Sequence, residues 1–215
     1  MKPKEAGSLF SSLYDPLTAP LEELGLRELR RKTLRGVRGN VLELGVGTGK
    51  NFPLYPPSVE RLVGMDPDEA MPRRAEQRAG KASFPVEAGK ASFPVEAVEA
   101  DAEELPFEDE SFDAVTATLV FCTIPDPARA LREARRVLTR GGQLRLLEHV
   151  RMERRPAAWT QKKATPVWKR LAGGCHLDRD TLSLVCRAGF EVDLVERHLD
   201  GLVLVIFARK DHATP

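Results

Sequence analysis

The sequence has 215 residues, of which 42% are hydrophobic, and this favours one α/β domain with a packed core. Its 33 basic and 32 acidic residues leave a net charge of +1, which argues against the strongly basic face of a nucleic-acid-binding protein. No apolar run is long enough to span a membrane and no signal peptide is evident, so we expect a cytoplasmic protein. The three cysteines, Cys122, Cys175 and Cys186, are too few and too scattered to predict a disulfide framework or a metal site.

Residues 1–39 are expected to form an N-terminal helical extension. Two helices are expected there, one around Leu9–Tyr14 and one over Pro20–Val37. The arginines between residues 27 and 38 are interpreted as solvated helix or loop surface rather than as groups that bind phosphate. The extension is therefore a candidate lid for a ligand site.

The most informative pattern lies in residues 41–49, Val-Leu-Glu-Leu-Gly-Val-Gly-Thr-Gly. A short apolar run typical of a buried strand leads directly into Gly45, Gly47 and Gly49, and glycine lets a ligand approach the backbone closely. Open α/β sheets bind nucleotides where a strand ends in such a turn and a helix begins. A dinucleotide fingerprint would need glycine at position 50, where Lys50 stands. A tight strand-to-helix turn without a ligand is the alternative interpretation.

The second expected strand, Arg61–Met65, ends at an acidic residue. Asp66 lies 17 positions after Gly49, near the distance at which a carboxylate accepts the two ribose hydroxyls of a bound nucleotide. Pro67 is expected to begin the next helix, because proline is tolerated in a first turn.

Residues 79–96 contain two identical copies of Ala-Gly-Lys-Ala-Ser-Phe-Pro-Val-Glu. Asp66 and Asp101 are separated by 35 positions, and removing one copy would leave 26. Two copies of so short a unit do not make a solenoid, so we interpret them as a tandem duplication in a loop. The strand expected over Val95–Ala100 should keep its place, and a functional β-hairpin is the alternative.

Asp101 and Ala102 follow this third expected strand. By itself Asp101 would be interpreted as a loop carboxylate or a helix cap, but it comes third after the glycine turn and Asp66, in the order of a cofactor site. Further along, Pro127–Leu138 has a helical apolar period, and a strand is expected over Gln143–Leu147 after a glycine pair.

The C-terminal part begins with residues 151–177, a stretch rich in lysine, tryptophan and proline. A helix is expected over Asp178–Ala188, with Asp178 as its N-cap. Two strands, Phe190–Leu199 and Leu202–Arg209, are joined by Asp200-Gly201, which is a strong hairpin signal. A hairpin that ends a series of alternating strands and helices argues against an NAD-binding dehydrogenase.

The glycine motif, the two ordered acids and the run Ser111–Val115 together resemble class I S-adenosylmethionine (SAM) methyltransferases. Residues 40–150 resemble the group that includes the ubiquinone and menaquinone methyltransferases. The resemblance implies a methyltransferase domain over residues 40–215 with an α/β, Rossmann-like seven-stranded sheet. That sheet would be parallel, with an antiparallel C-terminal hairpin and helices on both faces.

The resemblance also implies a cofactor and its binding residues. The cofactor would be SAM, leaving S-adenosylhomocysteine as product, and Asp101 would accept a hydrogen bond from the adenine amino group. The expected cofactor-binding residues are Glu43, Gly45, Val46, Gly47, Gly49, Asn51, Asp66, Pro67, Asp101, Ala102, Thr118 and Leu119.

Shorter stretches resemble the animal methyltransferase-like thiol methyltransferases: Asn51–Pro57, Leu119–Cys122, Glu148–Val150, Pro166–Lys169 and Gly174–Cys175. This resemblance implies a small lipophilic acceptor and favours a thiol. A methyltransferase acting at carbon, oxygen or nitrogen of a quinone precursor or lipid headgroup is one alternative. A non-catalytic nucleotide-binding protein is another, and the sequence leaves the oligomeric state open.

The methyl group of SAM is already activated on a sulfonium, so much of the catalysis can come from positioning. A thiol or hydroxyl acceptor must also lose a proton, and His149, at the end of the fifth expected strand, is the candidate base. A structural histidine bonded to a loop carbonyl is the alternative, and His176 is a second candidate base. Cys122 is interpreted as a small wall residue. Residues 151–177 are expected to cover the substrate. Trp159 and Trp168 from this segment and Tyr14 from the N-terminal extension are candidate lid aromatics, and plain core packing is the alternative.

Overall fold

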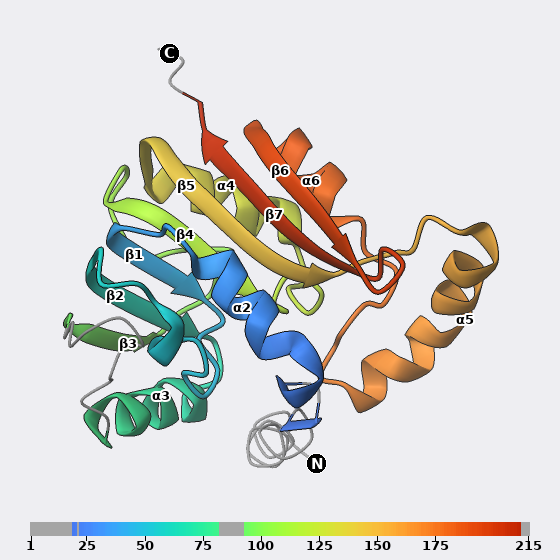
Figure 1. Ribbon diagram of the computed structural model, residues 1–215, viewed down its shortest axis with the longest axis horizontal. Coiled ribbons are helices and arrows are strands. Elements are labelled where there is room, and N and C mark those ends of the chain that lie inside the picture. The colour runs from blue at the N-terminus through green and yellow to red at the C-terminus, as the bar shows by residue number, and fades with distance from the viewer. Residues whose placement is uncertain (1–18, 21, 82–92, 212–215) are drawn as a thin grey trace.

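The computed structural model describes residues 19–20, 22–81 and 93–211, and one seven-stranded sheet organises them. The strand order is β3-β2-β1-β4-β5-β7-β6, and β7 runs antiparallel to both of its neighbours while the other pairs are parallel (Figure 1). The predicted sheet and its antiparallel C-terminal hairpin are therefore confirmed. The strands are β1 (Gly39–Leu44), β2 (Val59–Asp66), β3 (Val95–Glu99), β4 (Phe112–Thr118), β5 (Leu138–His149), β6 (Phe190–His198) and β7 (Val203–Lys210).

Helices cover both faces of the sheet, as predicted. In Figure 1, α2 crosses the front face and α4 and α6 lie behind it, whereas α5 extends to the side. The helices are η1 (Glu22–Leu26), α2 (Arg27–Leu34), η2 (Phe52–Leu54), α3 (Ala70–Lys81), α4 (Pro127–Val137), α5 (Arg155–Leu171) and α6 (Thr181–Arg187).

The alternation of side chains along each strand divides the core into two layers. In β1, Val41 packs with Leu34 of α2, while Leu42 packs in the other layer with Leu131 of α4. Successive side chains of a strand point to opposite faces, so the continuous apolar run of β1 is what a strand covered on both sides requires. The glycine turn is thus attached to one of the most deeply buried strands of the sheet.

The segment after the glycine turn differs from the expected helix. Only the short 3-10 helix η2 forms, with Pro53 inside it, and Tyr55 is extended. Pro56 and Pro57 follow at once, and prolines lack the backbone donors that an α-helix would need there. The chain instead folds Phe52 and Tyr55, both fully buried, against the sheet.

Pro67 does not begin α3, which starts at Ala70. Asp68 accounts for the shift, because its Oδ1 accepts a hydrogen bond from the Ala70 amide at 3.1 Å. An aspartate in this role favours a helix start just after it.

Asp178 does not cap α6 either. Asp180 is the N-cap, and its Oδ1 accepts from the Ser183 amide at 3.2 Å. Asp178 instead accepts a hydrogen bond from the Thr165 hydroxyl of α5 at 3.2 Å. The tertiary contact with α5 thus engages the first aspartate and leaves the second to cap the helix.

The hairpin between β6 and β7 confirms the sequence signal. Leu199, Asp200 and Gly201 all have positive φ, at 51°, 53° and 83°. The two strands pair from His198 with Val203 onward, with one register shift between Val192 and Leu194. The antiparallel edge of the sheet is therefore built by a tight local turn.

The N-terminal extension and the duplication are described only in part. Of the extension, the helix expected around Leu9–Tyr14 lies outside the described residues, and the second is divided into η1 and α2 at Gly25, whose φ is +116°. Of the duplicated segment, α3 contains residues 79–81 and β3 contains residues 95–96, while residues 82–92 lie outside the description.

Candidate active site

The glycine turn after β1 approaches the loop after β4 very closely. A Cβ atom added at Gly45, whose φ is +62°, would lie 2.5 Å from Cγ2 of Val120. Gly47, at φ +53°, has open space where its side chain would be, with the Gly45 carbonyl oxygen nearest at 4.0 Å. The first glycine is thus required by packing and the second leaves room for a ligand against the backbone.

Asp66 at the end of β2 lies against this turn, as the sequence predicted. Its Oδ2 accepts a hydrogen bond from the Gly47 amide at 3.1 Å, and its Oδ1 accepts from the Asp68 amide at 3.0 Å. Burial raises the pKa of Asp66 to about 6, although both hydrogen bonds favour the ionised form. A ligand that donates two hydroxyls to this carboxylate would compensate for its burial.

Beneath the turn lies a buried polar network that includes three of the expected cofactor residues, Glu43, Asn51 and Thr118. Asn51 donates to Glu43 Oε1 at 2.7 Å and to Thr118 Oγ1 at 2.9 Å, and Tyr55 donates to Glu43 Oε2 at 3.0 Å. Arg30 of α2 donates to Asn51 Oδ1 at 3.1 Å and also to Thr118. Burial raises the pKa of Glu43 to about 7. These side chains therefore brace the turn from below.

Arg30 and Tyr55 were missed by the sequence reasoning. Arg30 stands in an arginine-rich helix that was interpreted as solvated surface, yet it is only 3% exposed. No local signal distinguishes it from its arginine neighbours, because two of its partners, Asn51 and Thr118, lie 21 and 88 positions away. Through Arg30 the N-terminal extension is tied to the ends of β1 and β4.

Asp101, the expected adenine acid, is exposed at the start of the loop after β3, and Ala102 is buried beside it. Asp101 Oδ1 accepts from the Glu103 amide at 2.9 Å, which fixes the turn of the backbone there. Pro67, another of the expected cofactor-binding residues, is also exposed. Both side chains are therefore accessible to a ligand lying over the ends of β2 and β3.

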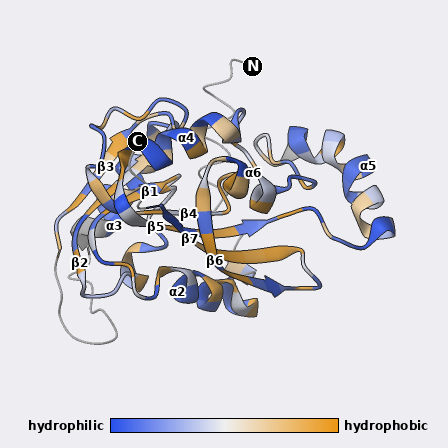
Figure 2. Ribbon diagram, turned by 90° about the horizontal axis from the view of Figure 1, so that it is seen from above, coloured by the Kyte–Doolittle hydropathy of each residue, from blue (hydrophilic) through white to orange (hydrophobic). Residues whose placement is uncertain are grey.

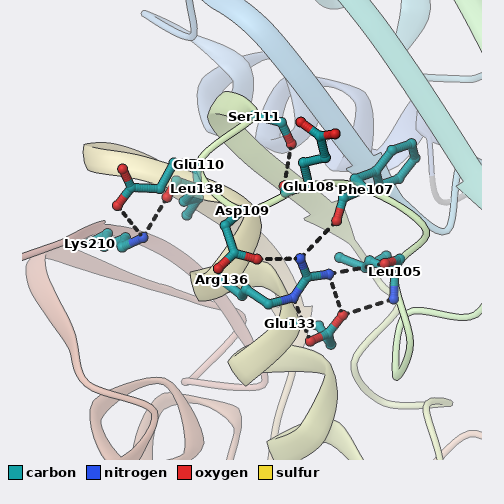
Figure 3. Close-up of polar contacts among 10 residues, drawn as sticks. All are labelled: Leu105, Phe107, Glu108, Asp109, Glu110, Ser111, Glu133, Arg136, Leu138 and Lys210. Carbon is teal, nitrogen blue, oxygen red and sulfur yellow. Dashed lines mark hydrogen bonds and ion pairs between the residues drawn. The ribbon is translucent and has the colours of Figure 1, made fainter.

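The loop that follows Asp101 is held in place by α4. Arg136 donates to the carbonyl oxygens of Phe107 and Leu105 at 2.8 and 3.0 Å, and to Asp109 Oδ1 at 2.8 Å. Glu133 completes the set by binding Arg136 and by accepting from the Leu105 amide at 2.9 Å (Figure 3). Five hydrogen bonds from one arginine give the loop a defined position next to the candidate site.

A second group of functional side chains lies past the ends of β4 and β5. Cys122 follows β4, His149 is the last residue of β5, and Cys175 comes from the loop after α5. One donor atom from each lies within 4.8 Å of the other two, and His149 Nε2 is 3.0 Å from Cys175 Sγ. The expectation that the cysteines are too scattered to form a site is therefore wrong for two of the three. Cys186 is exposed on α6.

Backbone contacts hold these three segments together. The His176 amide donates to the Cys122 carbonyl oxygen at 2.8 Å, and the Arg179 guanidinium donates to the carbonyl oxygens of Phe121 and Ile124. Gly174, with φ +92°, turns the chain just before Cys175. The cluster is thus set by the tertiary fold around the loop after β4.

The charge of the cluster is concentrated on one sulfur. Hydrogen bonds from Cys122 and His149 lower the pKa of Cys175 to about 4, against the opposing effect of burial. The contact with Cys175, together with burial, raises the pKa of the Cys122 thiol. Burial lowers the pKa of His149, but the Cys175 thiolate outweighs this, so the net pKa is raised. Cys175 therefore carries the negative charge and His149 faces it.

Helix α5 extends away from the sheet, as Figures 1 and 2 show, and it is followed by the loop that carries Cys175. Gln161 anchors it by donating to the carbonyl oxygens of Val150 and Leu177, both at 3.0 Å, and by accepting from the Met152 amide at 2.8 Å. Trp168 lies near enough to Cys175 to help lower the pKa of that thiol, although it is 44% exposed, and Trp159 is 64% exposed. The expected lid segment thus contacts the cluster through one tryptophan, while Tyr14 lies outside the described residues.

The open sheet, the glycine turn and the acid at the end of β2 define a nucleotide-binding α/β protein. Its residues 42–146 match the model of a methyltransferase domain family. The chain is 35% identical over 168 residues to the rat thiol S-methyltransferase TMT1B, a match that covers 76% of this chain and 66% of that protein. It is 35% identical over 136 residues to phosphatidylethanolamine N-methyltransferase of Cereibacter sphaeroides, covering 62% and 63% of the two chains.

A third relative is matched over more of its own length. The chain is 31% identical over 175 residues to demethylmenaquinone methyltransferase of Thermobifida fusca, and the match covers 76% of this chain and 71% of that protein. The chain therefore belongs to the SAM-dependent methyltransferases, and SAM is the cofactor of this family. The chain spans slightly less than two thirds of the thiol S-methyltransferase that it matches.

Solved structures agree on the fold. A crystal structure of a methyltransferase from Bacillus halodurans C-125 superposes with a TM-score of 0.67 at 23% identity, covering 86% of this chain and 98% of the other. The cyclase SpnF superposes with a TM-score of 0.72 at 18% identity, covering 98% and 96%. At such identities the likeness shows the fold alone. In the described part of the chain, no helix has the length and apolar character needed to cross a bilayer.

Proposed function

We propose that this protein transfers the methyl group of SAM to a small lipophilic thiol. The observation that carries the proposal is the Cys122–His149–Cys175 cluster, which lies at the ends of β4 and β5. Val120, in the loop that holds Cys122, packs directly against Gly45 of the glycine turn. Two cysteine thiols and a histidine thus lie next to the loop that contacts the glycine turn. The similarity to thiol S-methyltransferases also supports a thiol acceptor.

In this proposal SAM lies over the ends of β1, β2 and β4. Asp66 accepts the ribose hydroxyls, the exposed Asp101 accepts from adenine, and the open space at Gly47 admits the cofactor against the backbone. Thr118 ends β4, and Leu119 follows it at the start of the loop that leads to Cys122. The sulfonium methyl then points from the glycine turn toward Cys122 and His149.

The reaction is an in-line displacement. The acceptor thiol loses its proton, its sulfur forms a bond to the methyl carbon, and the bond between that carbon and the sulfonium breaks. The electron pair of the broken bond stays on the cofactor sulfur, giving S-adenosylhomocysteine and a methyl thioether. Alignment and exclusion of water account for much of the rate, and we place the loss of the thiol proton at the cluster that contains His149.

A second candidate acceptor is the amine of a lipid headgroup, which the composition of α5 favours. This helix contains no acidic residue and exposes Trp159, Val167 and Trp168, a combination typical of helices that lie on anionic lipid surfaces. The similarity to a phosphatidylethanolamine N-methyltransferase agrees with it. Its basic residues are Arg155, Lys162, Lys163, Lys169 and Arg170.

The two candidates are separated by measuring S-adenosylhomocysteine release with matched acceptors. Thiophenol and phenol differ only in the attacking atom, and vesicles of phosphatidylethanolamine supply the lipid amine. We expect release with thiophenol, none above background with phenol, and loss of release in the Asp66→Ala variant. If S-adenosylhomocysteine were released with the lipid vesicles and not with thiophenol, the acceptor would be the headgroup amine and not a thiol. Failure of the protein to bind SAM would refute methyl transfer altogether.

A further inference from the structure

The cluster past β4 and β5 consists of three atoms that bind soft metals. Two thiols and one imidazole form the donor set that catalytic zinc sites use, in which three protein ligands leave a fourth position for water or substrate. In the part of the chain that the structure describes, Cys122, His149 and Cys175 supply these three donor atoms. We propose that Cys122, His149 and Cys175 bind a Zn²⁺ ion whose fourth position takes the acceptor thiol.

The distances fit such a site with small adjustments. Zinc lies about 2.3 Å from cysteine sulfur and about 2.0 Å from histidine nitrogen, so a tetrahedral site separates two sulfurs by about 3.8 Å and a sulfur from a nitrogen by about 3.5 Å. The three donor atoms here all lie within 4.8 Å of one another, and His149 Nε2 is 3.0 Å from Cys175 Sγ. Shifts of about 1 Å or less bring them onto one ion.

Charge and burial also favour a cation. Cys122 is 3% exposed and Cys175 is 8% exposed, so without a cation a second thiolate at Cys122 would be repelled by the one at Cys175. A divalent ion neutralises both, which removes the cost of burying them together. It also accounts for His149 Nε2 turning toward a sulfur although the ring is largely buried.

The framework around the donors is rigid enough to hold an ion. His149 is fixed at the end of β5 by its pairing with Val203 of β7. Cys122 and Cys175 belong to loops that are joined by the hydrogen bond from the His176 amide to the Cys122 carbonyl oxygen. Because the donors come from three separate segments, the ion would also join α5 and its loop to the sheet.

The assignment of the acceptor thiol to the fourth coordination position of Zn²⁺ rests on the proposed function. A thiol that binds Zn²⁺ releases its proton to water and remains a metal-bound thiolate, because coordination lowers the thiol pKa. Its sulfur then attacks the methyl carbon of SAM, and the electron pair of the broken bond goes to S-adenosylhomocysteine. The thioether formed is neutral and a weaker ligand, so it leaves the ion. In this scheme His149 is a metal ligand and not a proton acceptor.

The first experiment measures metal binding without any turnover. The full chain is freed of metal with a chelator, kept reduced with a phosphine, and titrated with Co²⁺, which reports tetrahedral thiolate ligation by its visible and near-ultraviolet absorption. We expect equimolar binding with a thiolate-to-cobalt band, and displacement of that band by Zn²⁺. Cys122→Ser, Cys175→Ser and His149→Gln should each weaken binding by more than about tenfold.

Two substitutions outside the cluster serve as matched controls. Cys186→Ser removes an exposed thiol on α6, and His176→Gln removes the histidine next to Cys175. Both should leave the cobalt spectrum and its affinity unchanged. Circular dichroism and SAM titration on every variant check that the fold and the cofactor site persist. Cobalt binding that survives the cluster substitutions, or that is lost equally in the controls, would overturn the metal site.

The second experiment tests the fourth position with thiophenol and phenol. Thiophenol should shift the visible bands of the cobalt-loaded protein, and phenol should not. Chelation should reduce thiophenol methylation by about tenfold or more, and Zn²⁺ should restore it. Full methylation of thiophenol by metal-free protein would overturn the metal role and leave thiol transfer intact. Cobalt binding without any thiol methylation would refute the proposed function and leave the metal site intact.

Discussion

A side chain at Gly45 would collide with Val120, since an added Cβ would lie 2.5 Å from Cγ2 of that valine. The turn after β1 and the loop after β4 are therefore in direct contact. Gly45 belongs to the turn expected to receive the cofactor, and Val120 lies two residues before Cys122. A substitution that changes the packing at Gly45 should therefore also affect the loop that carries Cys122.

The first prediction concerns this contact. Gly45→Ala should weaken SAM binding and lower the free energy of unfolding by about 1–3 kcal/mol, because alanine is strained at φ +62° and must also displace Val120. Urea unfolding and calorimetric SAM titration measure the two effects. Gly36→Ala is the matched control, since Gly36 has φ +77° but nothing within 4 Å of an added Cβ. If Gly36→Ala weakened SAM binding equally, the contact with Val120 would be irrelevant to the cofactor.

The second prediction concerns Asp66. Asp66→Ala should sharply weaken SAM binding while the protein stays folded, since each hydrogen bond to a carboxylate contributes about 1.5–3 kcal/mol. Because the pKa of Asp66 is raised to about 6, protonation of the carboxyl below that pH should weaken SAM binding in the parent protein as well. Affinity should therefore rise with pH up to about 7 and level off, and Asp66→Asn should lose this dependence. Unchanged SAM affinity in Asp66→Ala would show that the ribose assignment is wrong.

A third prediction links Glu43 to stability. Its pKa rises from 4.5 to about 7 on folding, so between these values the folded state binds more protons than the unfolded state. The free energy of unfolding should then fall as pH rises through this window, by up to about 3 kcal/mol from this one group. Denaturant unfolding of the parent and of Glu43→Gln at pH 4.5 and 7 isolates the contribution as the difference between the two slopes. Parallel slopes would mean that Glu43 stays ionised throughout.

The fourth prediction concerns the duplication. The two copies are identical, so deleting residues 79–87 gives the same chain as deleting residues 88–96. The remaining copy supplies both the Ala-Gly-Lys that ends α3 and the Val-Glu that begins β3. SAM affinity should therefore be nearly unchanged, because lengthening or shortening a connection costs little. Calorimetry on the deletion variant measures this, and failure to obtain folded protein would show that both copies are structural.

The fifth prediction concerns α5. Trp168→Ala should reduce methyl transfer to thiophenol more than it reduces SAM affinity, because Trp168 contacts Cys175 and not the glycine turn. Trp159→Ala is the matched control, since Trp159 lies on the same helix, is more exposed and contacts Lys163. It should alter neither quantity. Equal losses of turnover and SAM affinity in Trp168→Ala would indicate ordinary packing and not a covering role.

The sequence alone predicts the structural features that depend on residues close together in the chain. The glycine turn, Asp66 at the end of a strand, and the Asp200-Gly201 hairpin are each specified within a few positions, and the structure places them as expected. Helix starts were less certain, since Asp178 and Asp180 are equally good caps locally. The contact of Asp178 with Thr165 decides between them, and that contact joins the loop before α6 to α5.

What the sequence alone determined is the class of fold and the cofactor turn, because backbone conformation and strand periodicity are local properties. Only the tertiary structure revealed that Arg30 donates a hydrogen bond to Thr118, 88 positions away, and that Cys122, His149 and Cys175 meet. The physical reason is that parallel strands bring their carboxyl ends to one edge of the sheet, whatever their separation along the chain. Side chains that are isolated in the sequence become neighbours there, and their shared chemistry exists only after folding.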